Sequence, residues 1–262
     1  MLRRGLRISV CVGALALVGA APAVAGERYV ALGDSYSSGT GTRQYYDAAC
    51  ERSNYSYAKL IDVQRANTDV VLAACGGAKT GDVLNTQVSN VTSTTKWVSI
   101  TIGGNDAGFS SVITECAKPS WASNCDARIN TAQSYISNTL PGQLDSVYNS
   151  IKSRAPTATV IPLSYPRLFM GVDCNAGTYF SSSEMTRLNQ TADLLRDKTR
   201  DAATRAGANF KFKDAIAPFT GHAVCSSTEW LNGLSNPTSE SYHPNRTGHS
   251  SGYAPLVRAV MG

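Results

Sequence analysis

A chain of 262 residues with 42% hydrophobic and 16% charged residues has the composition of a globular protein, and its formal net charge is +5. Residues 1–25 hold three arginines and no acidic residue, so the remaining 237 residues carry 21 Lys and Arg against 19 Asp and Glu, a net charge of +2. This near-neutral balance, without a run of Lys or Arg, argues against nucleic acid as a partner, because nucleic acid would require a basic stripe.

The first 25 residues are predicted to be a secretory signal peptide. Arg3, Arg4 and Arg7 precede an apolar run over residues 8–20, and Ala23-Val24-Ala25 offers the small residues that signal peptidase accepts. The apolar run is too short to span a bilayer core of about 30 Å. We therefore expect a secreted, extracellular protein in which residues 26–262 form a single domain, a length sufficient for one hydrophobic core.

Short apolar runs, often β-branched, alternate with stretches of helical character along this domain. The predicted strands are residues 29–32, 70–74, 98–102, 159–163 and, more weakly, 210–212. Between them, helices are predicted around residues 60–63, around 83–88, over 129–151 with an interruption at Pro141, and over 184–206. Strands that alternate with helices indicate an α/β protein, with a parallel sheet covered by helices on both faces.

Three unusual motifs each follow a predicted strand. Ser35 follows the first strand, Gly76-Gly77 the second and Gly103-Gly104-Asn105-Asp106 the third, so all three lie at the carboxyl edge of the sheet, where ligands bind in such folds. Singly, Ser35 could be an ordinary loop residue, Gly77 a turn glycine and Asn105 a helix cap. Together they offer a serine nucleophile with N–H donors for an oxyanion, which indicates an acyl-transfer site.

A serine nucleophile requires a base, and the chain contains three histidines. His243 lies in "ESYHPN", where Pro244 ends any regular element, and it is the favoured base. His249 begins an apolar-faced final helix and is expected to be a surface or capping residue. His222 lies in a loop beside Cys225 and is the less favoured alternative.

The domain contains six cysteines, and an even number in an exported chain indicates three disulfides, with 15 connectivities open: Cys50, Cys75, Cys116, Cys125, Cys174 and Cys225. The sequence has no Cys-x-x-Cys, and its histidines form no ligand pair with the cysteines. No metal site and no cofactor are therefore expected.

Four stretches resemble the signature blocks of the SGNH, or GDSL, hydrolase family, in that family's order: "GDSYSSG", "ACGGAKT", "IGGND" and "SYHPN". The cysteine pattern also resembles that of the secreted lipases and phospholipases A1 of filamentous actinobacteria. The resemblance implies a flavodoxin-like three-layer α/β/α fold with a parallel five-stranded sheet. It also implies Ser35 as nucleophile, an oxyanion hole of Ser35, Gly77 and Asn105, and the pairs Cys50–Cys75, Cys116–Cys125 and Cys174–Cys225.

The group that orients His243 departs from the family pattern. Many members have Asp three residues before the histidine, whereas this chain has Glu240. The backbone carbonyl of Ser241 is the alternative acceptor, and some actinobacterial members use such a carbonyl. We expect a Ser35–His243 dyad oriented by the Ser241 carbonyl, with Glu240 as an auxiliary at most.

The resemblance implies a serine ester hydrolase that acts on lipid carboxylic esters through an acyl-enzyme. The alternatives are a carbohydrate esterase of the acetylxylan type and a non-catalytic exported binding module. The aromatic-rich loop 165–180 could line an acyl groove or serve ordinary packing. We expect a monomer whose partners are its ester substrate and, transiently, a lipid surface.

Overall fold

Four parallel strands form the central sheet of the computed structural model, which describes Met1 and residues 26–262. The strands are β1 (Glu27–Gly33), β2 (Thr68–Leu72), β3 (Thr95–Thr101) and β4 (Thr159–Pro162), in the order β2-β1-β3-β4. From β1 the chain moves to β2 on one side and then to β3 on the other. The strand order therefore reverses between β1 and β3, and the carboxyl ends of these two strands border the position where such sheets bind ligands.

The fifth predicted strand is not regular. Phe210 and Lys213 form isolated parallel bridges with Val160 and Leu163, and the Lys211 N–H donates to the Val160 carbonyl at 2.7 Å. This apolar run is only three residues long and has one neighbouring strand, so it extends the pairing of β4 without becoming a strand of its own. The expected five-stranded sheet is thus corrected to four strands plus a bridged edge segment.

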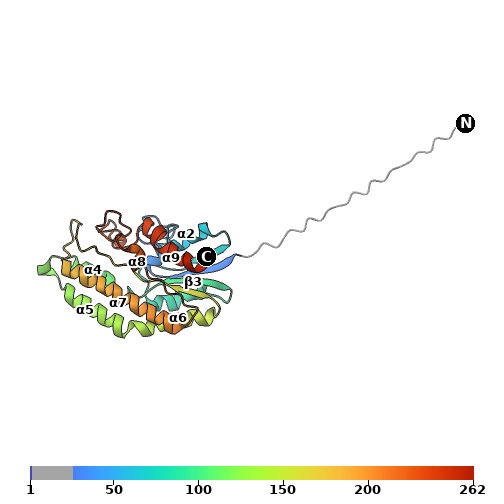
Figure 1. Ribbon diagram of the computed structural model, residues 1–262, viewed down its shortest axis with the longest axis horizontal. Coiled ribbons are helices and arrows are strands. Elements are labelled where there is room, and N and C mark those ends of the chain that lie inside the picture. The colour runs from blue at the N-terminus through green and yellow to red at the C-terminus, as the bar shows by residue number, and fades with distance from the viewer. Residues whose placement is uncertain (2–25) are drawn as a thin grey trace.

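Helices cover both faces of the sheet, as expected for three layers (Figure 1). One layer contains α5 (Cys125–Asn138), α6 (Leu140–Arg154) and α7 (Ser182–Ala206), which pack on one another. The other side contains α2 (Tyr57–Gln64), α8 (Ile216–Phe219) and α9 (Ala254–Met261). The interruption expected at Pro141 separates α5 from α6, because proline fits the first turn of a helix, where its missing N–H has no intrahelical partner.

The remaining helical segments are short, and several of them shape the carboxyl edge of the sheet. They are α1 (Ser35–Ser38), α3 (Thr80–Asp82), η1 (Val83–Gln87), η2 (Val88–Asn90), α4 (Phe109–Cys116), η3 (Ser120–Ala122), η4 (Thr238–Glu240) and η5 (Gly248–Tyr253). None of the described helices is long and apolar enough to cross a membrane. The predicted signal peptide lies almost wholly outside the described residues.

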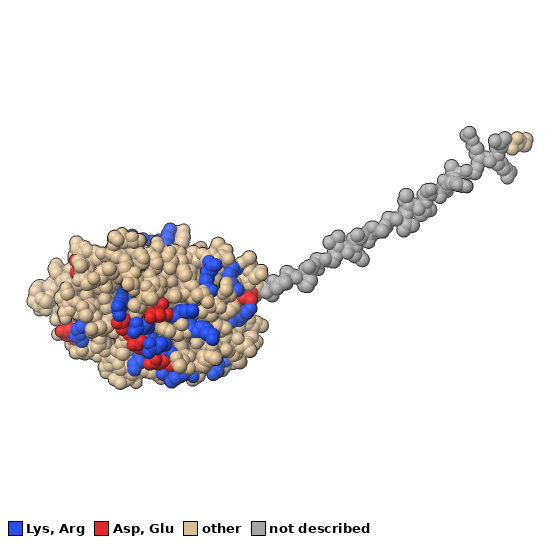
Figure 2. Space-filling model, viewed as in Figure 1, with Lys and Arg blue, Asp and Glu red and all other residues tan. Residues whose placement is uncertain are grey.

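The apolar core explains why β1 reads as a continuous hydrophobic run. Tyr29, Val30, Ala31 and Leu32 are all fully buried, because the central strand is covered by helices on both faces. Burying each large side chain contributes about 1.5–3 kcal/mol. On the outer surface of the α6–α7 layer, basic and acidic side chains are interleaved (Figure 2), as in the ion pair between Arg205 and Asp145.

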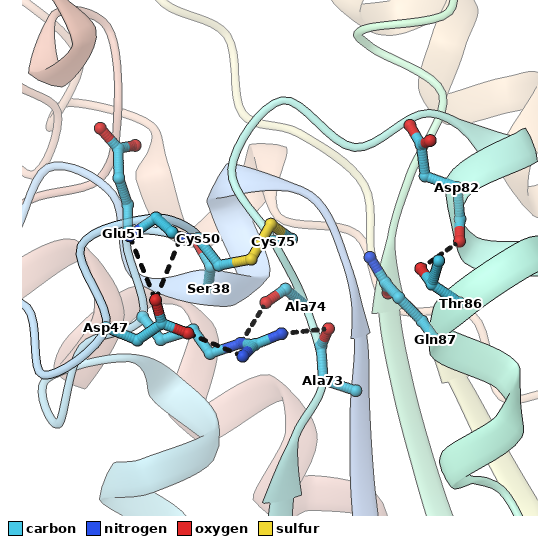
Figure 3. Close-up of a disulfide and its surroundings, with 12 residues drawn as sticks. Ser38, Asp47, Cys50, Glu51, Ala73, Ala74, Cys75, Asp82, Thr86 and Gln87 are labelled. Carbon is cyan, nitrogen blue, oxygen red and sulfur yellow. Dashed lines mark hydrogen bonds and ion pairs between the residues drawn. A yellow bond between two sulfur atoms is a disulfide. The ribbon is translucent and has the colours of Figure 1, made fainter.

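Three disulfides join Cys50 to Cys75, Cys116 to Cys125 and Cys174 to Cys225, across sequence separations of 25, 9 and 51 residues. Closing loops of these lengths contributes about 2–4 kcal/mol each in the chain-entropy model. The first bond ties the loop that carries Asp47 and Glu51 to the segment after β2 (Figure 3). It thereby fixes the start of the Gly76-Gly77 motif beside the end of β1.

Candidate active site

Ser35 is placed by a tight turn at the end of β1. At Gly33 the backbone has φ +118°, and a Cβ there would lie 2.1 Å from the Thr101 carbonyl oxygen, so the position requires glycine. Gln87 binds both the N–H and the carbonyl of Gly33, at 2.7 and 2.8 Å. Asp34 then caps α1 by accepting from the Tyr36 N–H, which makes Ser35 the first helical residue, with 8% of its surface exposed.

His243 reaches Ser35 from the other end of the chain. Its Nε2 lies 2.8 Å from Ser35 Oγ, and its Nδ1 lies 2.9 Å from the Ser241 carbonyl oxygen. Because a carbonyl only accepts, Nδ1 carries the hydrogen and Nε2 is left to accept from the serine hydroxyl. Desolvation lowers the pKa of His243 to about 4, against the opposing effect of the Ser241 carbonyl. The imidazole is therefore neutral at neutral pH and can accept a proton.

A tyrosine joins the serine turn to the histidine loop. The Tyr36 hydroxyl donates to the Tyr242 carbonyl at 2.6 Å, although the two residues are 206 positions apart. Asn232 closes the loop from the other side, since its N–H donates to the His243 carbonyl at 2.9 Å. The serine and the histidine are thus held by fixed backbone on two separate segments.

Glu240 is buried, with 2% of its surface exposed, and its side chain accepts from the Tyr45 hydroxyl at 2.6 Å. The structure places the imidazole Nδ1 on the Ser241 carbonyl and the Glu240 carboxylate on Tyr45. Within residues 26–262, no hydrogen bond joins Glu240 to His243. The two candidate acceptors near the histidine therefore have different partners.

Gly77 and Asn105 line the same cavity as Ser35 and His243. Gly77 has φ +76° and open space where a Cβ would be, so nothing there shields its backbone. The Asn105 side-chain amide donates one hydrogen to the Ala78 carbonyl at 3.0 Å. Its second amide hydrogen is the one that could form a hydrogen bond to an oxyanion.

Two further contacts, which sequence reasoning missed, brace these loops. Asp106 accepts from the Thr80 hydroxyl at 2.6 Å and from the Thr80 N–H, which fastens the segment after β2 to the segment after β3. The Tyr165 hydroxyl donates to the carboxylate of Asp34 and accepts from the Gly104 N–H at 3.3 Å. Asp34 is only 1% exposed, and this burial raises its pKa to about 7. The only sequence signal for this brace was the position of Asp34 beside Ser35.

The cavity has a volume of about 470 Å³, and much of its lining is apolar: Phe109, Ile113, Ala117, Leu168, Ala192, Leu195 and Leu234. The loop 165–180 contributes both to the cavity wall and to the packing of the core. Tyr165 and Leu168 line the cavity, whereas Phe169 and Phe180 pack on each other in the core with ring centroids 4.8 Å apart.

The other two histidines lie outside this arrangement. His222 stacks on Trp230, with ring centroids 3.8 Å apart. The prediction that His249 lies on the surface is wrong, because the side chain is fully buried. Its ring does act as a cap, but for α2 and not for its own segment, since it accepts from the Tyr57 N–H at the start of α2 at 3.3 Å. Burial lowers the pKa of His249 to about 3, so its ring packs as a neutral group against Tyr57 and Tyr253.

One group of potential metal ligands occurs among the described residues: Cys174, Cys225 and Glu229. The two sulfurs of this group are bonded to each other, so neither is the thiolate that a metal would require.

A parallel α/β sheet with a histidine-paired serine and backbone donors beside an apolar cavity defines a class of protein, the serine ester hydrolases. Within that class, the chain belongs to the GDSL-like Lipase/Acylhydrolase family, whose model matches residues 31–250. The family resemblance drawn from the four sequence motifs is thereby confirmed.

Individual relatives agree with this assignment. The chain is 44% identical over 255 residues to a lipase of Streptomyces rimosus. The aligned region covers 94% of this chain and 93% of that lipase. The fold is similar to the crystal structure of an extracellular lipase from Streptomyces rimosus, with a TM-score of 0.83 and 44% identity over 89% of this chain and 99% of that one. A phospholipase A1 from Streptomyces albidoflavus NA297 also matches, with a TM-score of 0.83 and 42% identity over 90% of this chain and 99% of that chain.

The chain is therefore an ester hydrolase of the lipase and acylhydrolase type. Its three disulfides are consistent with an oxidising, extracytoplasmic compartment.

Proposed function

We propose that this protein hydrolyses lipid carboxylic esters by two-step acyl transfer, with Ser35 as the nucleophile and His243 as the base. The observation that carries the proposal is the 2.8 Å contact between Ser35 Oγ and His243 Nε2 in the wall of a cavity whose lining is largely apolar. A cavity with such walls suits an acyl chain better than the polar rings of an acetylated polysaccharide.

In the first step, Nε2 of His243 takes the hydroxyl proton while Ser35 Oγ forms a bond to the ester carbonyl carbon. The negative charge on the carbonyl oxygen is received by the N–H groups of Ser35 and Gly77 and by the free amide hydrogen of Asn105. The imidazolium then returns its proton to the leaving alcohol as the carbon–oxygen bond of the ester breaks. Water, deprotonated by the same imidazole, releases the fatty acid and restores the serine.

The same proposal covers where the protein acts. Residues 1–25 would direct secretion, and residues 26–262 would act outside the cell as a single catalytic domain that is a monomer. Three exposed apolar side chains, Val172, Tyr179 and Leu234, are 62%, 59% and 42% exposed, and Leu234 also lines the cavity. Leu234 adjoins the loop that carries the other two, because its N–H donates to Asn175 Oδ1 at 3.3 Å. The three side chains support a transient contact between this part of the surface and a lipid surface.

A panel of substrates with one purified preparation tests the proposal: short and long acyl esters, triacylglycerol, phosphatidylcholine and acetylated xylan. We expect the lipid esters to be cleaved and acetyl release from xylan to be negligible. Preferential release of acetate from xylan would assign the protein to the carbohydrate esterases. A preparation that cleaves no ester and resists a fluorophosphonate would be a binding module, because such a module has no need for an activated serine.

Replacing Glu240 by alanine tests what orients His243. If the Ser241 carbonyl holds Nδ1, the loss in kcat should be below about tenfold, whereas removing the acid of a true triad costs about 10⁴. Kinetics on a soluble ester would measure the loss. Glu240→Gln is the matched control, because it keeps an acceptor for the Tyr45 hydroxyl and separates loss of charge from loss of packing. A loss of thousands in both variants would assign the role to Glu240.

A further inference from the structure

A second hollow adjoins the apolar cavity at Asn105. It has a volume of about 550 Å³, and it shares Asn105, Ser110 and Thr114 with the cavity wall. Its other lining residues are Lys79, Gly108, Ser111, Glu115 and Arg128. The proposed oxyanion donor therefore stands between a space with apolar walls and a space with polar and charged walls.

The second hollow has an excess of positive charge. Among the residues that the structure describes, no carboxylate lies within 4 Å of the Lys79 ammonium or the Arg128 guanidinium, and both residues line the hollow. The one acid of the hollow, Glu115, is already bound by the Lys118 ammonium at 2.6 Å and by the Asn124 N–H at 2.9 Å. Arg128 also attracts this carboxylate and helps to lower the pKa of Glu115, after Lys118 and the Asn124 N–H. Because neither Lys79 nor Arg128 is paired within 4 Å, both cations can still bind an anion in the hollow.

Both cations stand on segments fixed relative to Asn105. Lys79 follows Ala78, whose carbonyl binds the Asn105 amide, and its own N–H donates to Asp82 at 2.8 Å. Arg128 lies in the first turn of α5, three residues after Cys125, which is bonded to Cys116 at the end of α4. The hollow therefore does not depend on a free loop for its shape.

These positions specify the form of a substrate. Consider an ester whose carbonyl lies at Asn105 and whose acyl chain lies along the apolar wall. If this ester also has an anionic group a few bonds from the carbonyl, that group would lie between the two cations. A glycerophospholipid has this form, because its phosphodiester lies a short distance along the glycerol from the first ester. A triacylglycerol has no charge to place there.

We propose that the hollow between Lys79 and Arg128 is a subsite that binds the phosphodiester of a glycerophospholipid while Ser35 attacks a neighbouring acyl ester. The inference rests on the proposed lipid-ester activity and adds a preference to it, for phospholipids over neutral glycerides. Lys79 and Arg128 are specificity-determining residues, because they touch the substrate away from the bond that breaks.

The test uses two soluble substrates with the same acyl chains, dibutyroyl-phosphatidylcholine and tributyrin, both below the concentrations at which they aggregate. Monomeric substrates remove the general attraction of cations to a charged interface. The variant is Lys79→Gln with Arg128→Gln. Its control is Arg154→Gln with Lys211→Gln, which removes two exposed cations near the amino end of β4, whereas the site lies at the carboxyl ends of the strands.

We expect the Lys79/Arg128 variant to lose about tenfold in kcat/KM on the phosphatidylcholine, since each exposed ion pair contributes a factor of up to about five. Its kcat/KM on tributyrin, and the activity of the control on both substrates, should stay within twofold of wild type. The two single variants should each show an intermediate loss on the phosphatidylcholine alone.

A loss below twofold on the phosphatidylcholine, or an equal loss on both substrates, would overturn the subsite. A wild-type protein that cleaves tributyrin but not the phosphatidylcholine would also overturn it, and the lipid-ester function would stand. If wild type cleaved neither substrate and released acetate from xylan instead, the proposed function itself would fall.

Discussion

Replacing Ser35 by alanine is expected to lower kcat by on the order of 10⁴-fold or more. Without its hydroxyl the site retains substrate binding and the oxyanion donors but can form no acyl-enzyme. The fold should persist, because the turn depends on Gly33, Gln87 and the Asp34 cap. The serine hydroxyl binds none of these three groups; its partner is His243. The measurement is kcat on a soluble ester, together with the mass added by a fluorophosphonate.

The matched control for this variant is Ser239→Ala, an exposed serine in the wall of the same cavity. It should keep wild-type kcat and take up one equivalent of the fluorophosphonate, whereas Ser35→Ala should take up none. Turnover within tenfold of wild type, in a Ser35→Ala preparation free of wild type, would remove Ser35 from the mechanism.

Replacing Asn105 by alanine is expected to cost about 10²–10³ in kcat, with KM much less affected. The free amide hydrogen would bind the carbonyl oxygen only when that oxygen is in the position, and has the charge, of the tetrahedral intermediate, so its loss falls on the chemical step. The comparison of kcat with KM on a soluble ester is the measurement.

Asn105 also binds the Ala78 carbonyl, so the variant requires a structural check. The neighbouring clamp between Asp106 and Thr80 remains, and the free energy of unfolding should fall by only about 1 kcal/mol. Asn105→Asp, which keeps the shape but replaces the donor by an anion, should lose at least as much kcat as the alanine variant. A change confined to KM would mean that Asn105 only positions the substrate.

Local sequence patterns were sufficient for the four regular strands, for the long helices and for the carboxyl edge of the sheet as the place of the candidate site. The run over residues 29–32 lies within β1, and residues 184–206 lie within α7, whose start is fixed by a capping box between Ser181 and Glu184. Such signals are contained in a few neighbouring residues. The motifs around Ser35, Gly77 and Asn105 follow β1, β2 and β3. They come together because the strands of a parallel sheet end at one edge.

Where local pattern was weak, the sequence was less reliable. The three-residue run at residues 210–212 has the composition of a strand, but its conformation depends on pairing with one neighbour, and it forms only bridges. His249 lies among polar residues that suggest a surface, yet the packing of α2 against the end of the chain buries it. Burial of a single side chain depends on which elements meet, and neighbouring residues do not encode that.

The sequence by itself determined the α/β class, the order of the elements and the edge of the sheet that holds the candidate site. Only the tertiary structure decided which groups meet there: the bond from Tyr165 to Asp34, the separation of Glu240 from His243, and the hollow that holds Lys79 and Arg128. The physical reason is the separation along the sequence between the residues that stabilise each feature. A strand or a cap is stabilised by residues a few positions apart, whereas Asp34 and Tyr165 are 131 positions apart and Ser35 and His243 are 208 apart. Contacts of that kind exist only after the sheet has ordered its strands and the core has fixed its loops.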